Sequence, residues 1–428
     1  IGKLEDQRSD FYKNYKVCDP AMGSGHFLVG ALKHLTNLYV KKLYEESEGD
    51  VKISETEAKR IILDKCIFGV DINASAVKLA KLSLWLESAD INYKLERLED
   101  QLICANALYS TNIWKEHPKL MQNGFKAIIG NPPYIGEKGN KDKFMPVKAG
   151  PLKRFYQGKM DYFYFFFHLA LELVQDKYRV GMISTNYFPT AMGAIKLRTD
   201  LYERSNIKEI INFGEKKIFD SAAGQHNQIT IFEKREEDPK TTIRNQMELV
   251  MFHGKGLLTP DEFNDKIYSK ESRNIIPSSQ LFEGENKYLR INKTSSADGS
   301  FTDIHTKMAS FPDKLGDLCR INNGVHTQAD YLSKKKFEMR DNKTKSQGDG
   351  IYVLNMEVEE DKKLIRKIKS DKSESRLLVP FFKNSDVSQF ETSSKPKKHL
   401  IYLNKRSEDL GNFPLIGDHL KSFETIIS

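Results

Sequence analysis

The sequence is poor in cysteine and has no short cysteine spacings. Its four cysteines, Cys18, Cys66, Cys104 and Cys319, are scattered through 428 residues. This distribution excludes the paired spacings of a structural zinc site and the dense spacing of a disulfide framework. Three of the four stand in apolar, strand-like stretches, so we expect small core residues and a reducing, cytoplasmic location.

Long apolar runs are also missing. The most apolar window, residues 163–174, is short and contains His168 and Glu172, so the sequence predicts no membrane-spanning helix. No signal peptide is recognisable at the N-terminus. The chain begins at Ile1 rather than at methionine and stops at Ser428, which indicates a fragment of a longer protein.

The chain is long enough for two or three domains with substantial cores. Lysine and arginine number 67 against 59 aspartate and glutamate residues, which gives a formal net charge of +8. This mild positive excess is compatible with a polyanionic partner and identifies none by itself.

Apolar, strand-like stretches alternate with helical patterns between residues 15 and 235. This alternation predicts an open, doubly wound α/β sheet. The seven expected strands are residues 15–18, 66–72, 102–108, 125–129, 179–184, 207–213 and 228–233. Ligands of such sheets bind at the carboxyl ends of the strands. In this prediction those ends carry Asp19, Asp71, Asn106 and Asn131.

The first expected strand is followed by Asp-Pro-Ala-Met-Gly-Ser-Gly-His-Phe at residues 19–27. Gly23 and Gly25 would let the backbone approach a ligand closely, and the positive end of the following helix would point at it. A dinucleotide-binding fingerprint needs a third glycine where this chain has Leu28. The loop therefore predicts a nucleotide site of another kind.

Two further polar residues close expected strands. Asp71 stands where an α/β fold places an acid for ribose hydroxyls, or else the stretch from Asp71 to Asn73 only caps the next helix. Asn106 could hydrogen-bond an adenine edge through its amide, or could equally cap a turn. The helix expected over residues 76–86 is apolar nearly all round, which predicts burial against the sheet.

The stretch Asn131-Pro132-Pro133-Tyr134 follows the fourth expected strand. Its two prolines remove backbone donors and hold an extended turn, so the carbonyls of Asn131 and Pro132 have little freedom to relax. The Asn131 side-chain oxygen beside a fixed carbonyl makes a pair of acceptors, which suits an amino group. Tyr134 offers a flat face to a planar ring. The alternative is a strand-ending turn with an incidental tyrosine.

Residues 136–159 are rich in lysine and glycine, which is typical of a solvated, mobile loop or of a loop that closes over a nucleic-acid backbone. The aromatic-rich helix expected over residues 161–174 is predicted to be core. Residues 236–310 are polar and poor in strand signals, which predicts a connector. Lysine-rich patches at residues 362–372 and 395–398 suit phosphate contacts or are solvated faces.

Residues 19–27 followed by Asn131 to Tyr134 resemble the amino-group DNA methyltransferases that modify adenine N6. The order of the two motifs resembles the gamma arrangement of these enzymes. Within that group the chain looks most like the modification part of single-chain, Eco57I-like type IIG restriction–modification enzymes. The likeness is strong over residues 15–235 and looser over residues 311–428. One departure is that residues 1–14 contain no Tyr-Thr-Pro-like turn, which family members place upstream of the glycine loop.

The resemblance implies a Rossmann-like, seven-stranded S-adenosylmethionine-dependent methyltransferase sheet over residues 1–235. A connector would follow over residues 236–310. Residues 311–428 would be the first part of an α+β target-recognition domain that is incomplete in this chain. The implied cofactor is S-adenosylmethionine, and no metal is implied.

The resemblance also assigns roles to single residues. Asp71 would bind the ribose of the cofactor, and Ile72 would pack on its adenine ring. The cofactor-binding set would be Asp19, Pro20, Ala21, Gly23, Gly25, Phe27, Asp71, Ile72 and Asn106. The catalytic set would be Asn131, Pro132, Pro133 and Tyr134, with Tyr134 stacked on a flipped adenine. A second base contact would come from residues 219–227, where Phe219 and His226 are the candidates.

The chemistry of an aromatic amine suits such a turn. Its lone pair is delocalised into the ring, and two acceptors on its hydrogens favour a localised lone pair without a strong base. Double-stranded DNA is then the expected partner, with the base leaving the duplex at a cost of a few kcal/mol.

Two other functions remain open from the sequence: an RNA or protein-glutamine N-methyltransferase, and a DNA-specificity module with a silent methylation site. No Asp…Glu-x-Lys nuclease cluster is recognisable in this chain. A nuclease is therefore expected in the full-length chain or in a separate restriction subunit.

Overall fold

The chain folds into two units, residues Ile1–Ser310 and Phe311–Ser428. The computed structural model describes residues 8–50, 52–89, 97–109, 113–116, 124–219, 226–236, 246–289, 291, 307, 310–313, 315–319, 330, 349–383, 386–388, 391–392, 395–403 and 410–424.

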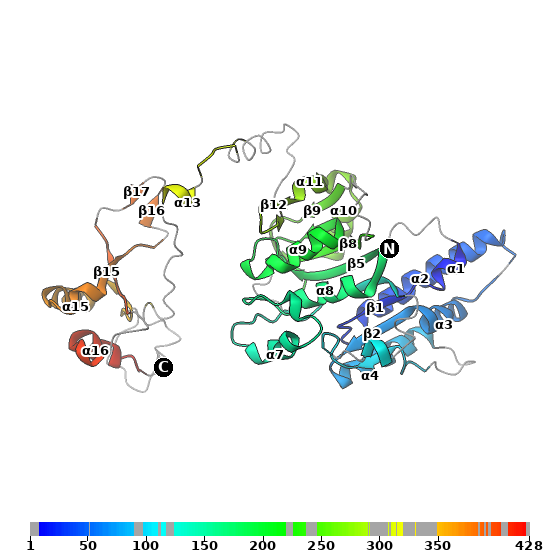
Figure 1. Ribbon diagram of the computed structural model, residues 1–428, viewed down its shortest axis with the longest axis horizontal. Coiled ribbons are helices and arrows are strands. Elements are labelled where there is room, and N and C mark those ends of the chain that lie inside the picture. The colour runs from blue at the N-terminus through cyan, green and yellow to red at the C-terminus, as the bar shows by residue number, and fades with distance from the viewer. Residues whose placement is uncertain are drawn as a thin grey trace. The chain divides into compact units, whose positions relative to one another are not determined.

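A nine-stranded sheet is the framework of the first unit, with the strand order β11-β9-β6-β8-β5-β4-β1-β2-β3 (Figure 1). Its strands are β1 (Val17–Asp19), β2 (Ile67–Asp71), β3 (Leu102–Cys104), β4 (Phe125–Gly130), β5 (Val174–Thr185), β6 (Ser205–Asn212), β8 (Asn227–Lys234), β9 (Gln246–Met251) and β11 (Arg273–Pro277). β8 runs antiparallel to β5 and β6, and β11 runs antiparallel to β9. The other neighbours pair in parallel. All seven expected strands are present, which confirms the expected open α/β sheet.

Helices cover both faces of this sheet, and successive strand residues enter two separate cores because side chains alternate along a strand. Val17 and Ala127 belong to the core with α2, α3 and α4, whereas their neighbours Cys18 and Ile128 belong to the core with α8 and α9. The helices are α2 (His26–Glu46), α3 (Glu55–Cys66), α4 (Ala74–Ser88), α8 (Phe163–Leu173) and α9 (Ile195–Arg204). The result is a three-layer arrangement that leaves the ends of the strands accessible to ligands.

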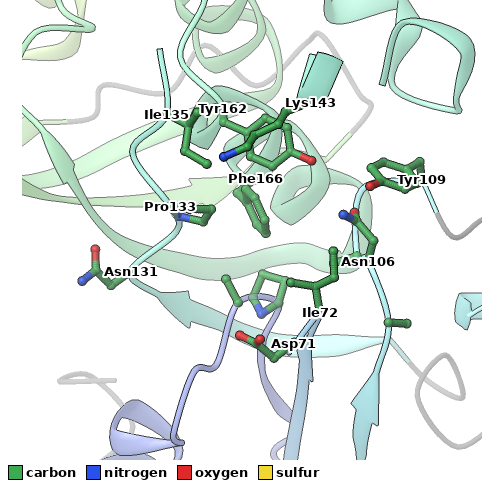
Figure 2. A pocket seen from close by; sticks show the side chains of 14 residues that line it. Asp71, Ile72, Asn106, Tyr109, Asn131, Pro133, Ile135, Lys143, Tyr162 and Phe166 are labelled. Carbon is green, nitrogen blue, oxygen red and sulfur yellow. The ribbon is translucent and has the colours of Figure 1, made fainter. Parts of the chain in front are cut away.

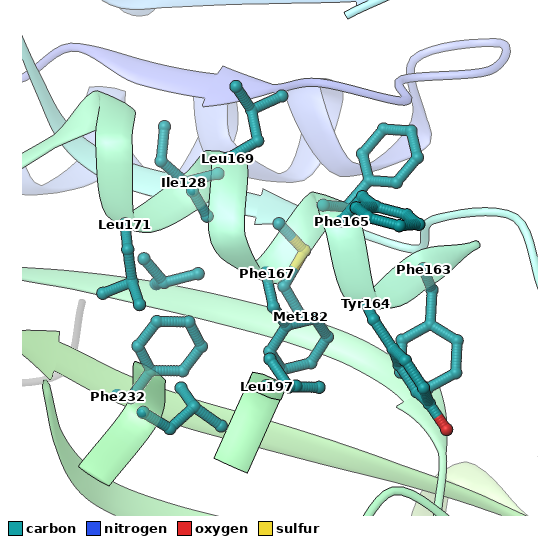
Figure 3. Close-up of a cluster of buried hydrophobic side chains, with 14 of the residues drawn as sticks. Ile128, Phe163, Tyr164, Phe165, Phe167, Leu169, Leu171, Met182, Leu197 and Phe232 are labelled. Carbon is teal, nitrogen blue, oxygen red and sulfur yellow. The ribbon is translucent and has the colours of Figure 1, made fainter. Parts of the chain in front are cut away.

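α8 is a core helix, as its aromatic sequence predicts. Every residue of α8 except Glu172 is buried. Its aromatic side chains spread to several sides of the helix (Figure 3). The ring of Phe167 stacks on Phe232 of β8 with centroids 5.7 Å apart, and the ring of Phe163 meets Tyr134 edge-on at 5.8 Å. α8 therefore joins the core to the turn that follows β4.

α4 departs from the prediction of a helix buried on all sides. Val77, Ala80 and Leu84 are buried, so the sheet and α2 use one face of the helix only. Three leucines on the remaining surface are largely exposed. They are Leu79, Leu82 and Leu86, with exposed fractions of 53%, 49% and 70%. Apolar composition overstated burial here because a helix that packs against one layer needs only one apolar stripe.

The stretch expected to be a strand-poor connector contributes two strands to the main sheet. β9 pairs in parallel with β6, and β11 adds an antiparallel edge strand beside β9. The same stretch contains β10 (Lys255–Leu257), α10 (Pro260–Tyr268), α11 (Ser278–Leu281), β12 (Phe282–Glu283) and β13 (Tyr288–Leu289). Residues 246–289 are therefore part of the first unit and extend its sheet.

The second unit is an α+β arrangement, as expected. Its three-stranded antiparallel sheet has the order β14-β18-β15. The elements are β14 (Val353–Asn355), α15 (Glu359–Ser370), β15 (Leu378–Phe381), β18 (Lys398–Ile401) and α16 (Pro414–Lys421). Buried Glu374 accepts hydrogen bonds from the Leu415 and Ile416 amides at 2.9 and 2.8 Å, so it caps the start of α16.

The composition predicted buried cysteines and no membrane-spanning helix. Cys18 and Cys66 are buried as expected, but Cys104 is exposed, because β3 ends there and its side chain leaves the core. Among the described residues, no helix is both long and apolar enough to cross a membrane.

Candidate functional site

A pocket of about 500 Å³ lies at the carboxyl ends of β1, β2, β3 and β4 (Figure 2). The predicted site residues that line it are Pro20, Ala21, Asp71, Ile72, Asn106, Asn131 and Pro133. They come from four separate loops, which the parallel strands bring to one edge of the sheet. Asn131 lies at one end of the pocket in Figure 2, and Asn106 lies toward the other.

The glycine loop after β1 makes a tight turn beside this pocket. Gly23 and Gly25 both have positive φ, at 54° and 85°, which favours glycine. A Cβ on Gly25 would lie 3.0 Å from the Cβ of Ala80 in α4, whereas a Cβ on Gly23 would meet nothing within 4 Å. Gly25 therefore allows the loop to pack on α4, and Gly23 leaves open space beside the backbone.

Asp71 holds two loops together at the end of β2. Its Oδ2 accepts a hydrogen bond from the Gly23 amide at 2.9 Å, and its Oδ1 accepts one from the Asn73 amide at 2.8 Å. Asn73 is the residue that caps α4, because its Oδ1 accepts from the Ser75 and Ala76 amides. Asn73 therefore caps α4, and Asp71 lines the pocket.

Asp19 is buried behind the pocket with part of its carboxylate unsatisfied. Oδ1 accepts a hydrogen bond from the Ala21 amide at 2.9 Å, and buried Oδ2 has no hydrogen-bond partner among the described residues. Burial raises the pKa of Asp19 to about 7, the Ala21 amide opposes this shift, and the Asp71 carboxylate adds to it. A buried acceptor without a partner is costly, so this atom points to a ligand donor.

The far end of the pocket suits a planar, apolar ring. Ile72 is 65% exposed although it is apolar, and it lines the pocket together with Phe166 of α8. Asn106 also lines it and makes a turn, since its Oδ1 accepts from the Leu108 amide at 3.0 Å. Asn106 therefore forms the turn and also lines the pocket, so one of its two predicted roles does not exclude the other.

Some lining residues were missed by sequence reasoning. They are Tyr109, Ile135, Lys143, Tyr162 and Phe166. Phe166 could not be separated from the other aromatics of α8 by its spacing, because the whole helix reads as core. The lysine content of residues 136–159 was a signal for Lys143, but it did not select this lysine.

The turn after β4 is held by its own side chains. The Tyr134 hydroxyl donates a hydrogen bond to Asn131 Oδ1 at 2.5 Å. Burial raises the pKa of the Tyr134 hydroxyl, which therefore stays protonated and remains a donor. Pro132 is buried, and half-buried Tyr134 packs its ring against Phe163. The stacking role of Tyr134 on a substrate ring stays a prediction.

The segment after this turn is ordered, which corrects the expectation of a mobile loop at residues 136–159. It contains α7 (Lys141–Ala149), which buries Phe144 and Val147. Buried Glu137 accepts from the Tyr156 hydroxyl, and the Glu137 amide donates to the Met160 carbonyl at 2.9 Å. Apolar anchors within a lysine-rich sequence therefore fix α7 in place over the pocket, where Lys143 contributes to its lining.

Eight predicted residues do not line this pocket. Five of them lie in the segments 19–25 and 131–134, of which other residues line it: Asp19, Gly23, Gly25, Pro132 and Tyr134. The other three are Phe27, Phe219 and His226. Phe27 is 42% exposed and lines a separate hollow at the start of α2. Phe219 is 36% exposed, just before residues 220–225, which lie outside the described part. His226 Nδ1 donates to the Gly214 carbonyl at 2.8 Å, and its ring meets Tyr187 edge-on. The contacts proposed for Phe27, Phe219 and His226 with ligand or base stay predictions.

No three described histidine, cysteine, aspartate or glutamate side chains gather closely enough to hold a metal ion. The pocket is lined by the carboxylate of Asp71, by the amide groups of Asn106 and Asn131, and by apolar side chains. Such a pocket can bind a nucleoside with a charged substituent, and the turn at Asn131 adds hydrogen-bond acceptors at its edge.

Comparison with known proteins gives a family match over residues 65–219, to the Eco57I restriction-modification methylase family. The type II restriction enzyme and methyltransferase RM.Eco57I of Escherichia coli is 26% identical over 234 residues, which are 48% of this chain and 23% of that protein. The putative type II restriction enzyme and methyltransferase RM.MjaORFECS2P of Methanocaldococcus jannaschii is 38% identical over 102 residues, which are 22% of this chain and 8% of that protein.

Among solved structures, the type IIL restriction-modification enzyme MmeI in complex with DNA aligns with a TM-score of 0.51 at 15% identity. The alignment covers 100% of this chain and 51% of MmeI. At this identity the likeness concerns the fold. The chain spans less than a quarter of each of the two sequence relatives, and the resemblance to Eco57I-like methylases is confirmed.

Proposed function

We propose, from the match of residues 65–219 to the Eco57I restriction-modification methylases, that this chain is an adenine-specific DNA methyltransferase. It would transfer a methyl group from S-adenosylmethionine to N6 of a flipped adenine, as the modification part of a restriction–modification or phage-defence system. The observation that carries the proposal is the position of Asn131 at the edge of a nucleoside-sized pocket that also holds Asp71.

The residues of the pocket fit S-adenosylmethionine. Asp71 is placed to accept from the ribose hydroxyls, and the exposed Ile72 is placed to pack on the adenine ring. Unsatisfied Asp19 Oδ2 would take the ammonium group of the methionine part, with Gly23 leaving room for it. S-adenosylmethionine supplies an electrophilic methyl group when bound.

The turn at Asn131 would orient the substrate amine. The side-chain oxygen of Asn131 and the carbonyl of Pro132 would accept the two hydrogens of N6, which favours a localised lone pair on that nitrogen. An amide oxygen has two lone pairs, so Asn131 Oδ1 could keep the Tyr134 hydroxyl while it accepts from N6. Rate enhancement would then come from positioning and charge placement, without a general base.

Binding of the cofactor should depend on pH through Asp19. The free carboxyl has a pKa of about 7, and only its ionised form pairs with an ammonium group. Affinity should therefore rise several-fold from about pH 6 to about pH 7.5, and should fall again at higher pH as the ammonium group of the ligand loses its proton. Calorimetric titration with S-adenosylmethionine across this range measures the slope. Asp19→Asn should bind weakly and without this rise, and a rise in that variant would assign the titration to another group.

We propose DNA as the substrate because the second unit offers a basic helix. α15 buries Ile365 and Ile368 and exposes Lys363, Arg366 and Lys367, while its acidic residues are confined to the first turn. This distribution suits contact with phosphates. The restriction activity of such a system would come from a nuclease elsewhere in a longer chain or from a separate subunit.

Reversing one charge on α15 should weaken DNA binding without affecting the cofactor. Arg366→Glu is expected to raise Kd for DNA about three- to tenfold and to make the salt dependence of binding shallower by about one unit of slope. Filter binding at several salt concentrations measures both. Lys41→Glu on the exposed surface of α2 is the matched control. Equal slopes for the two variants would remove α15 from the DNA interface.

Transfer of tritiated methyl groups tests the function as a whole. The protein is incubated with labelled S-adenosylmethionine and duplex DNA, RNA or protein, and N6-methyladenine is measured in the nucleic acids. Label in duplex DNA as N6-methyladenine is the expected result. Label in RNA or protein only would favour the other methyltransferases, and cofactor-independent DNA binding without transfer would favour a silent specificity module. Methylome sequencing after expression of the full-length gene would then report the recognition sequence.

A further inference from the structure

A small second sheet braces the segment that leads to Phe219. β7 (Glu215–Lys217) pairs in parallel with β10, with Lys216 opposite Gly256. The Leu258 amide extends this pairing by donating to the Lys217 carbonyl at 2.9 Å. Backbone hydrogen bonds therefore fix this segment as far as Lys217, two residues before Phe219. The strand that provides them, β10, belongs to the stretch that the sequence predicted to be a connector.

α10 packs behind this small sheet through aromatic rings. Phe213, Phe252 and Phe263 form a stack in which the ring centroids of Phe213 and Phe252 lie 5.4 Å apart and those of Phe252 and Phe263 lie 6.1 Å apart. Ile218 packs against the same cluster. The residue immediately before Phe219 is thus anchored in a core to which α10 contributes.

Charged groups tie α10 to the neighbouring strands. Lys216 of β7, which is mostly buried, contacts Glu262 of α10 at 2.8 Å. Arg273 of β11 donates to the Ile267 carbonyl at the end of α10 and contacts Glu209 of β6, both at 2.9 Å. α10 is therefore attached to β7 on one side and to the main sheet on the other.

The other end of the same connection, His226, is tied to the same turn. His226 Nδ1 donates to the Gly214 carbonyl. Gly214 has a φ of +55°, and a Cβ there would lie 2.7 Å from the carbonyl oxygen of Phe252. The turn that starts β7 consequently packs directly on the backbone that leads into β10, and both candidate base contacts depend on it.

We infer that residues 252–268 are a positioning element for the target base, acting through Phe219 and His226. This rests on the proposed function. The turn at Asn131 would hold the base on one side, and Phe219 and His226 would hold it on the other, at an orientation set by β10 and α10. Phe263 and Glu262 are accordingly positioning residues, because they touch neither cofactor nor base.

The test removes the aromatic support with Phe263→Ala. On long unmethylated duplex DNA of mixed sequence, kcat should fall about tenfold or more, because small misplacements of a positioned base are costly. KM for S-adenosylmethionine should stay unchanged. Phe263→Leu, which keeps most of the apolar volume, should restore most of the loss. Glu215→Gln is the control, since it removes an exposed ion pair with Lys255 between the same two strands.

A double-mutant cycle separates positioning from general destabilisation. If α10 acts through Phe219, then Phe263→Ala should have little further effect in a Phe219→Ala background. A loss that multiplies with that of Phe219→Ala, or wild-type kcat in Phe263→Ala, would overturn the inference. Should Phe263→Ala fail to fold, Glu262→Gln takes its place in the same cycle. A wild-type protein that transfers no methyl group to DNA, RNA or protein would overturn the proposed function itself.

Discussion

Replacement of Asn131 by alanine is expected to slow methyl transfer by about 10²- to 10³-fold and leave cofactor binding intact. The variant loses the side-chain oxygen that would accept a hydrogen of N6, and it also releases the Tyr134 hydroxyl. Removing one positioned polar group that acts in the transition state typically costs about 10²- to 10³-fold in kcat. Single-turnover transfer to duplex DNA measures the loss, and the shift in Tm with S-adenosylmethionine reports cofactor binding.

Asn140→Ala is the matched control for this substitution. Asn140 lies in the same segment, and its Nδ2 donates to the Gly136 carbonyl at the surface. The control should therefore keep transfer near the wild-type rate. Wild-type activity in Asn131→Ala would exclude the proposed mechanism, whereas loss of transfer in both variants would assign the effect to the fold of the segment.

Gly130→Ala adds one methyl group and is expected to disturb both the Asp19 carboxylate and the turn after β4. A Cβ on Gly130 would lie 2.6 Å from Asp19 Oδ1, a distance that real Cβ atoms essentially never show. Both groups are buried, so either the carboxylate or the turn after β4 must move. Cofactor affinity and kcat should each fall by more than about tenfold, since an ångström of misplacement is enough for such losses.

Gly136→Ala separates this effect from the general consequence of adding a side chain. A Cβ at Gly136 would meet nothing within 4 Å, so this variant should bind the cofactor and transfer methyl groups normally. Circular dichroism and Tm measurements on both variants monitor the fold. Normal cofactor affinity in Gly130→Ala would show that Asp19 is not needed for binding.

The sheet and one edge of the site were predictable because their signals are local. A buried parallel strand is a short apolar run that closes on a polar residue, and Asp71 and Asn131 both follow such runs. Their meeting in one pocket then follows from the parallel order of β2, β1 and β4. The glycine loop was predictable for a similar reason, since Gly23 and Gly25 are required by positive φ.

Other parts of the fold and of the site depend on contacts between residues far apart in the sequence, which the local sequence pattern does not reveal. Strands β9 and β11 pair with each other at one edge of the sheet, and their short apolar runs stand within a largely polar stretch of sequence. Phe166 lines the pocket, but nothing in its spacing distinguishes it from Phe165 or Phe167, which face the core. The fold of α7 depends on the burial of Phe144 within a lysine-rich stretch.

The reversed direction of β8 has a consequence for how such proteins diversify. β6 ends and β8 begins at the same edge of the sheet, with Asn212 opposite Gln228. Both ends of the intervening connection, Asn212 and Asn227, therefore lie at one edge, so a change in its length alters no strand crossover. The proposed second base contact, Phe219 or His226, therefore lies in a connection that can vary in length without disturbing the sheet.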